Sequence, residues 1–116
     1  MTPEELISQI KTKPAQIQFK DVIAVIDHHF NYTAVRFSNG LAEHTIINEP
    51  GSNEGSCKIF AFALKMGLNK EETLHCFGHY YRDDVLSHPQ AKDHANIRTF
   101  IQFGWEGIHF ETPALE

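Results

Sequence analysis

The run of residues 57–66, CKIFAFALKM, constrains the fold of this chain more than any other segment. It is apolar on nearly every side of a helix, and only Lys58 and Lys65 interrupt it. A helix that is apolar all round must be surrounded by other elements of the structure. The sequence therefore predicts one buried central helix with helices or strands packed around it. A chain of 116 residues is long enough to form this arrangement as a single domain, 1–116, without a disulfide or a metal.

Two capping boxes predict where other helices begin. Thr2 with Glu5 three residues later opens the first, which should end before residue 14. Asn69 with Glu72 opens another, whose apolar spacing predicts a helix through about Val85. Residues 19–30 and 95–103 also carry apolar side chains at helical spacing, so each predicts a helix.

Three short segments predict strands. Residues 32–37 alternate apolar and polar side chains and lead into Asn39-Gly40, a pair typical of hairpin turns. Residues 44–48 would return as the partner strand, and residues 104–110 would end in a further short strand. The predicted fold class is α+β and predominantly helical, with about five helices and a small two- or three-stranded antiparallel sheet.

The charge pattern excludes two classes of partner. Ten basic and fifteen acidic residues give a net charge of −5, and the basic residues are scattered. Nucleic-acid and membrane-surface binders instead gather Lys and Arg into patches, so we expect neither partner. Two cysteines without a CxxC pair suit a reducing compartment, and no signal-like or membrane-spanning stretch is present, so we expect a soluble cytoplasmic protein.

The segment GSNEGSCKIF, residues 51–60, is the first candidate site. Its glycines are spaced one residue too closely for a phosphate-binding P-loop. Two interpretations remain: Ser56 or Asn53 caps the helix, or the free N–H groups at the helix start bind an anion. If the helix start binds an anion, Lys58, Arg82 and Arg98 would converge on this ligand. The candidate ligand-binding residues are Asn53, Glu54, Ser56, Cys57, Lys58, Tyr80 and Arg82.

Two other kinds of chemistry are open. Cys57 near a helix start is either an activated nucleophile or a small buried core residue. His75, His79 and Asp83 follow one another at spacings of four, so on one helix they would share a face, and His94 would fold back toward them. Two interpretations are open: the two imidazoles and the carboxylate bind a metal ion, or the three residues form an exposed polar face of the helix. No cofactor is specified by either pattern.

An aromatic cluster offers a third alternative, a contact patch for a protein partner. Phe103, Trp105 and Phe110 lie close together near the C-terminus of the chain. Exposed aromatic residues of this kind are enriched where proteins bind one another.

Several segments of the sequence resemble those of one protein family. NEGSCKIFAFA and TLHCFGHYYRDDVL, with the segments around them, are similar to the HopJ family, named for a type III effector of plant-pathogenic bacteria. The resemblance covers roughly residues 17–115, leaving the N-terminal helix largely outside. It implies no established reaction or cofactor. It gives translocation into a host cell as an alternative to a cytoplasmic location.

These observations favour a small binding module for a polar or anionic ligand or a partner protein. The alternative is a small metal-dependent enzyme that uses the His/Asp cluster. The sequence leaves open whether the protein is an enzyme.

Overall fold

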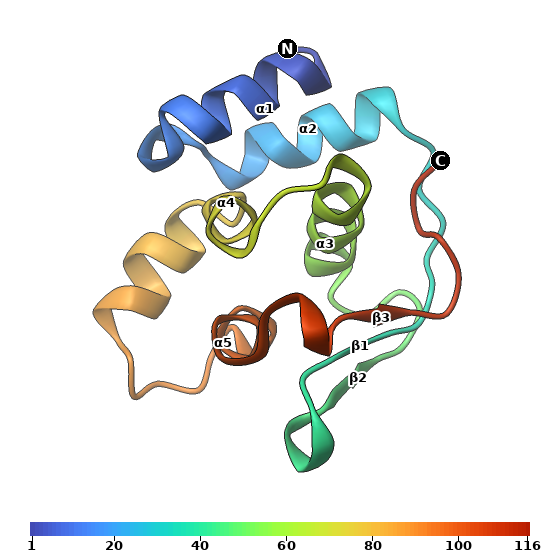
Figure 1. Cartoon of the computed structure of the whole chain (residues 1–116), viewed down its shortest axis with the longest axis vertical. Helices are drawn as coiled ribbons and strands as arrows, with labels where there is room; N and C mark the ends of the chain where they lie inside the picture. The colour runs from blue at the N-terminus through green and yellow to red at the C-terminus, as the bar shows by residue number, and fades with distance from the viewer.

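A computed structural model describes residues 1–116 and confirms a mostly helical α+β fold (Figure 1). None of its helices is both long enough and apolar enough to cross a membrane. In chain order, the helices and strands are α1 (Pro3–Thr12), η1 (Pro14–Gln16), α2 (Phe19–His29), β1 (Phe37–Asn39), η2 (Ala42–His44), β2 (Ile46–Asn48), α3 (Glu54–Met66), α4 (Lys70–His75), the π-helix η3 (Tyr80–Val85), α5 (Ala95–Phe103), η4 (Gly104–Gly107) and β3 (His109–Phe110).

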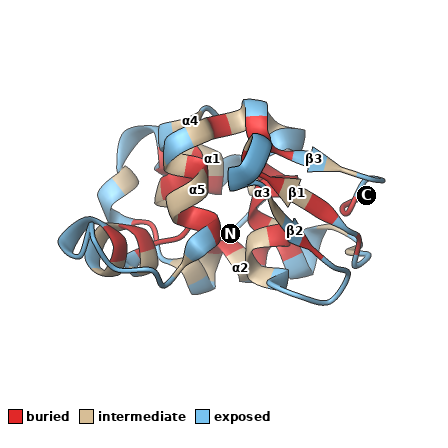
Figure 2. Ribbon diagram, turned by 90° about the horizontal axis from the view of Figure 1, so that it is seen from below, coloured by how far each residue is buried: buried red, intermediate tan, exposed pale blue.

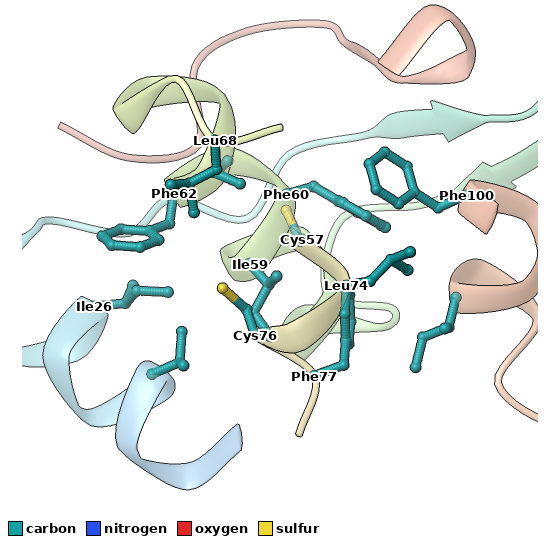
Figure 3. Close-up of a cluster of buried hydrophobic side chains, with 14 of the residues drawn as sticks. Ile26, Cys57, Ile59, Phe60, Phe62, Leu68, Leu74, Cys76, Phe77 and Phe100 are labelled. Atoms are coloured by element: carbon teal, nitrogen blue, oxygen red, sulfur yellow. The ribbon is translucent and has the colours of Figure 1, made fainter. Parts of the chain in front are cut away.

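The predicted central helix is α3. In Figure 1, α1 and α2 run antiparallel across one end of α3, and α4 and α5 lie beside it. The sheet lies near the end of α3 that is away from α1 and α2. Buried residues line the inward faces of these elements, while exposed residues lie on the outside (Figure 2). Phe60 on α3 is fully buried, and its ring lies 4.9 Å from that of Phe100 on α5 and 5.4 Å from that of Phe77 (Figure 3).

Both predicted capping boxes are present. Thr2 accepts a hydrogen bond from the N–H of Glu5, and the Glu5 carboxylate accepts one from the N–H of Thr2. Asn69 and Glu72 make the same reciprocal pair at the start of α4. Each box satisfies two N–H groups that the helix itself cannot bond, which explains why these two starts could be predicted from local sequence.

The small sheet has the strand order β2-β1-β3 and is antiparallel throughout. The structure confirms the predicted hairpin between β1 and β2, but the turn does not lie at Asn39-Gly40 as predicted. Asn39 is the last residue of β1 and pairs with Ile46, and residues 40–45 form the connection, with Gly40 at φ 108°. The strand predicted at 32–37 is also wrong, because only Phe37 joins the sheet and Tyr32 makes an isolated bridge to Leu115.

The single helix predicted from residue 70 to Val85 is wrong as well. Helix α4 ends at His75, and a separate π-helix begins at Tyr80. Gly78 lies between them at φ 59°, and a Cβ atom at this position would lie 2.7 Å from the backbone nitrogen of Phe19. The left-handed backbone favours glycine, and the close approach to the start of α2 leaves no room for a Cβ atom. The apolar residues keep their helical spacing through this break, so the sequence pattern did not reveal where α4 ends.

Candidate ligand-binding site

The starts of α3 and α5 face the same cavity. This α3/α5 cavity has a volume of about 360 Å³, and Asn53, Gly55 and Ser56 line it from α3. Residues 94–97 line it from α5. Its remaining wall is mainly apolar and comes from Phe19, Ile46, Phe77 and Tyr80. The cavity therefore combines two helix N-termini with aromatic surface.

Neither helix start carries a side-chain cap. Asn53 and His94 are the N-cap residues, and both have left-handed backbones, at φ 52° and φ 53°. The first intrahelical bonds run from the N–H of Cys57 to Asn53 and from the N–H of Arg98 to His94. The N–H groups of residues 54–56 and 95–97 therefore have no acceptor within the protein. Such groups, together with the positive end of each helix dipole, attract an anion.

The amide of Asn53 does not cap α3 because it joins a network of asparagines. Its Nδ2 donates to Asn48 Oδ1 at 2.8 Å, and Asn96 Nδ2 donates to the same oxygen at 2.9 Å. Asn48 and Asn39 both donate to Asn96 Oδ1, at 3.1 and 3.0 Å. These bonds connect the two helix starts to β1 and β2, so the sheet fixes the positions of both helices at the cavity.

His94 and Tyr80 form one polar side of the cavity. His94 Nε2 lies 3.0 Å from Asp84 Oδ2 and 3.8 Å from Asp93 Oδ2, so carboxylates hold the imidazole ring in place. The ring centroids of Tyr80 and His94 are 5.1 Å apart, and Phe19 packs edge-on against Tyr80 at 5.1 Å. Tyr80 and Asp84 both come from the π-helix η3, an unusual element that often occurs at functional sites.

The structure separates the ligand-binding residues predicted from α3. Asn53 and Ser56 line the cavity, whereas Glu54 is exposed and Cys57 is buried in the core. Lys58 Nζ forms an ion pair with Asp27 at 2.9 Å, which connects α3 to α2.

The three basic residues expected around the ligand do not converge. Lys58, Arg82 and Arg98 are all absent from the lining of the α3/α5 cavity. Arg98 pairs with Asp93 at 2.7 Å. Arg82 donates to the backbone carbonyls of Pro14 and Ile17, which connects η3 to the segment before α2. Any anion in this cavity would therefore be bound by backbone N–H groups and not by these cations.

The predicted metal ligands are not brought together either. No three His, Cys, Asp or Glu side chains lie close enough to hold a metal ion. His75 Nδ1 lies 3.2 Å from Arg82 Nη1, while His79 is exposed and its ring centroid lies 4.2 Å from that of Tyr80. Asp83 is exposed, and His94 pairs with Asp84 instead. The shared face depended on one continuous helix, and the break at Gly78 removes that helix.

The three C-terminal aromatic residues pack in separate places. Trp105 lies 5.1 Å from Phe100 and donates from Nε1 to the carbonyl of Leu68 at 3.0 Å. Phe110 stacks on Phe37 at 5.1 Å. Phe103 lies beside His44, with ring centroids 5.6 Å apart. Each side chain is half-buried in its own contact, so the three do not form one exposed patch.

Burial makes both cysteines poor nucleophiles. It raises the pKa of the Cys57 thiol, and it raises the pKa of Cys76 to about 12. Both thiols therefore stay protonated at pH 8, and we expect Ellman's reagent to label neither in the native protein. Both should react within seconds to minutes in denaturant. Rapid labelling of one thiol in the folded protein would contradict the buried interpretation of that cysteine.

Several residues of the α3/α5 cavity carry no functional signal in the sequence. Ala95 and Asn96 precede an ordinary apolar stripe, and Gly55 and Phe19 carry no reactive group. The one available signal was that Asn53 and His94 both directly precede a helix, which is where N-cap residues occur. Nothing in the local sequence showed that these two helix starts meet.

Comparison with known proteins agrees with the fold. The family model for "HopJ type III effector protein" matches residues 3–115, so it includes α1, which the resemblance had left largely outside. A crystal structure titled "unknown function protein VPA0580" is 46% identical, with a TM-score of 0.92 over 97% of this chain and 91% of that chain. No curated protein matches the chain. This chain therefore belongs to the HopJ type III effector protein family.

Proposed function

We propose that the protein is a binding module whose α3/α5 cavity takes a small anionic ligand. One observation carries the proposal: the first residues of two helices whose starts have no side-chain cap line a single cavity, and the first N–H groups of both helices have no acceptor within the protein. Uncapped starts are costly when they have no acceptor, and an anion supplies the acceptor and interacts favourably with both dipoles. The starts of α1 and α4 carry capping boxes, whereas α2, like α3 and α5, begins without a side-chain cap, so it is the meeting of two such starts at one cavity that supports the proposal.

The surroundings favour a ligand with one negative charge and a flat apolar body. Asp84 and Asp93 lie beside His94, and Glu54 is in the first turn of α3, so these carboxylates oppose a highly charged anion. Phe19 and Tyr80 offer ring surface on which a planar group can pack. An aryl carboxylate has both features and serves as a probe.

Calorimetric titration with benzoate, and with benzamide as its neutral counterpart, tests the proposal. Benzoate should bind and benzamide should not, because the two differ mainly in the negative charge. The Ala95→Glu variant should weaken benzoate binding about tenfold, which corresponds to about 1.4 kcal/mol. Ala95 is exposed and lines the cavity at the first position of α5, so a carboxylate there would compete with the ligand.

The matched control is Ala95→Gln, which has the size of Glu without the charge. It should bind benzoate within about twofold of the wild-type protein, a difference well below 1 kcal/mol. Loss of folding cannot explain weaker binding to Ala95→Glu, because an acidic residue in the first turn stabilises a helix. Equal affinity of the two variants, or equal binding of benzoate and benzamide, would refute the proposed anion site.

We propose a cytoplasmic location for the protein, as the sequence suggested. The family description names a type III effector, which suggests a bacterial effector context. The two cysteines, which form no disulfide, suit a reducing compartment and support the cytoplasmic proposal. A secretion assay with a reporter fused after α1 tests it: reporter confined to the bacterial cell supports it, and reporter delivered by the type III apparatus refutes it.

A further inference from the structure

A second cavity is lined in part by the same two aromatic residues, Phe19 and Tyr80. This α2 cavity has a volume of about 350 Å³ and shares those two residues with the α3/α5 cavity. Its other lining residues are Gln18, Lys20, His79 and Arg82. Lysine, arginine and histidine therefore surround one hollow in a protein whose net charge is −5.

The cationic groups around the α2 cavity have no carboxylate partners. None of the ion pairs in the structure includes Lys20, His79 or Arg82. The other two arginines, Arg36 and Arg98, each pair with at least one acid. A half-buried guanidinium normally gains such a partner because burial penalises an uncompensated charge. The positive charge at this cavity is therefore available to an anionic ligand.

Hydrogen bonds hold Arg82 in place but do not use all of its N–H donors. Its Nη1 donates to the carbonyl of Pro14 at 3.1 Å and to the carbonyl of His75 at 3.3 Å, and its Nη2 donates to the carbonyl of Ile17. The Nε–H group and one Nη2 hydrogen have no acceptor within the protein. Neutral carbonyls fix the side chain without cancelling its charge, so the guanidinium is positioned in advance for an anion.

The acidic residues nearby do not cancel this charge. Asp83 is exposed on η3, and Asp21 on α2 lines a different hollow with His28 and His29. Neither lies within ion-pair distance of a cation at the α2 cavity. Lys20 and His79 are exposed and carry no hydrogen bond, so both side chains are available to a ligand.

We propose that the α2 cavity binds a phosphate group. Lys20 and Arg82 supply two positive charges and His79 a further hydrogen-bonding group, which suits a dianion better than a monocarboxylate. Phe19 and Tyr80 at the cavity wall offer aromatic surface to the body of a phosphate ester. The charged side chains of this site, Lys20, His79 and Arg82, do not line the α3/α5 cavity, although both cavities include Phe19 and Tyr80.

Titration of the labelled protein with inorganic phosphate and with phenyl phosphate, followed by amide NMR, tests this site. We expect saturable shifts of the Phe19 and Lys20 amides with both probes. Tighter binding of phenyl phosphate assigns the site to a phosphate ester, and equal affinity assigns it to free phosphate. Shifts confined to Gly55, Ser56 and Asn96, or no saturable shifts at millimolar phosphate, would overturn the proposal.

Two lysine variants with the same change in charge provide the control. Lys20→Glu should weaken phosphate binding about tenfold or more, whereas Lys65→Glu should leave it within about twofold. Lys20 is exposed in the first turn of α2, where an acidic residue is favourable, so this variant should remain folded. Lys65 is exposed near the end of α3 and lies outside both cavities. Equal weakening by the two variants would show a general charge effect and refute the site.

Discussion

Replacing Phe60 with alanine should reduce the free energy of unfolding by about 3–5 kcal/mol, the range for a buried phenylalanine. Phe60 is fully buried, and four aromatic rings lie near it. Their centroid distances are 4.9 Å to Phe100, 5.4 Å to Phe77, 6.0 Å to Phe37 and 6.4 Å to Trp105. The substitution removes the ring at which α3, α5 and the sheet meet. Urea denaturation followed by Trp105 fluorescence measures the loss.

Leu64→Ala on the same helix is the control for Phe60→Ala. The Leu64 side chain is 56% exposed, so its removal should change the free energy of unfolding by no more than about 0.5 kcal/mol. Both variants introduce the same helix-forming residue into α3. A similar loss in the two proteins would contradict the central position of Phe60 in the core.

Replacing Asn96 with alanine should reduce the free energy of unfolding by about 2 kcal/mol, because Asn48 Nδ2 loses its acceptor and a buried polar group left unsatisfied costs about 1–3 kcal/mol. Asn39 Nδ2 keeps its bond to the backbone carbonyl of Asn96 in this variant. Asn96 Oδ1 accepts from Asn39 and Asn48, and its Nδ2 donates to Asn48 Oδ1. All three residues are buried, so water does not readily replace the lost bonds. Asn39 Oδ1 already has no partner, which leaves this network little tolerance for further loss.

The same substitution should also disturb the α3/α5 cavity, because the network connects Asn53 at one helix start to Asn96 at the other. We therefore expect Asn96→Ala to weaken benzoate binding in addition to lowering stability. Asn31→Ala removes an exposed amide that makes no side-chain hydrogen bond, and it should change stability by less than about 0.5 kcal/mol. If Asn96→Ala were as mild as Asn31→Ala, the network would not hold the helix starts.

Local sequence predicted the elements whose signals are themselves local. The capping boxes at Thr2 and Asn69 depend on contacts three residues apart, and α3 was evident from its apolar run. The end of α4 was missed because it depends on Gly78 approaching Phe19, which is distant in the sequence. The predicted metal cluster failed for the same reason, since His75 and His79 lie on opposite sides of that break.

The candidate site was predicted only in part. The interpretation of residues 51–60 as a helix start was correct, and Asn53 is its N-cap residue. However, Asn53 donates its amide to Asn48 and does not cap the helix, and Asn48 is itself bonded to Asn96 of α5, which is distant in the sequence. The second helix start, at His94, reaches the cavity through the tertiary fold. A meeting of two distant segments leaves no pattern in either segment alone.

The most direct test of the anion site is an amide NMR titration of the wild-type protein with benzoate. Amides at the two helix starts should shift together with one affinity, namely those of Gly55, Ser56, Ala95 and Asn96. Downfield movement of their protons would indicate new hydrogen bonds to the carboxylate. Shifts at only one helix start, or shifts scattered over the surface without saturation, would contradict a site built from both helices.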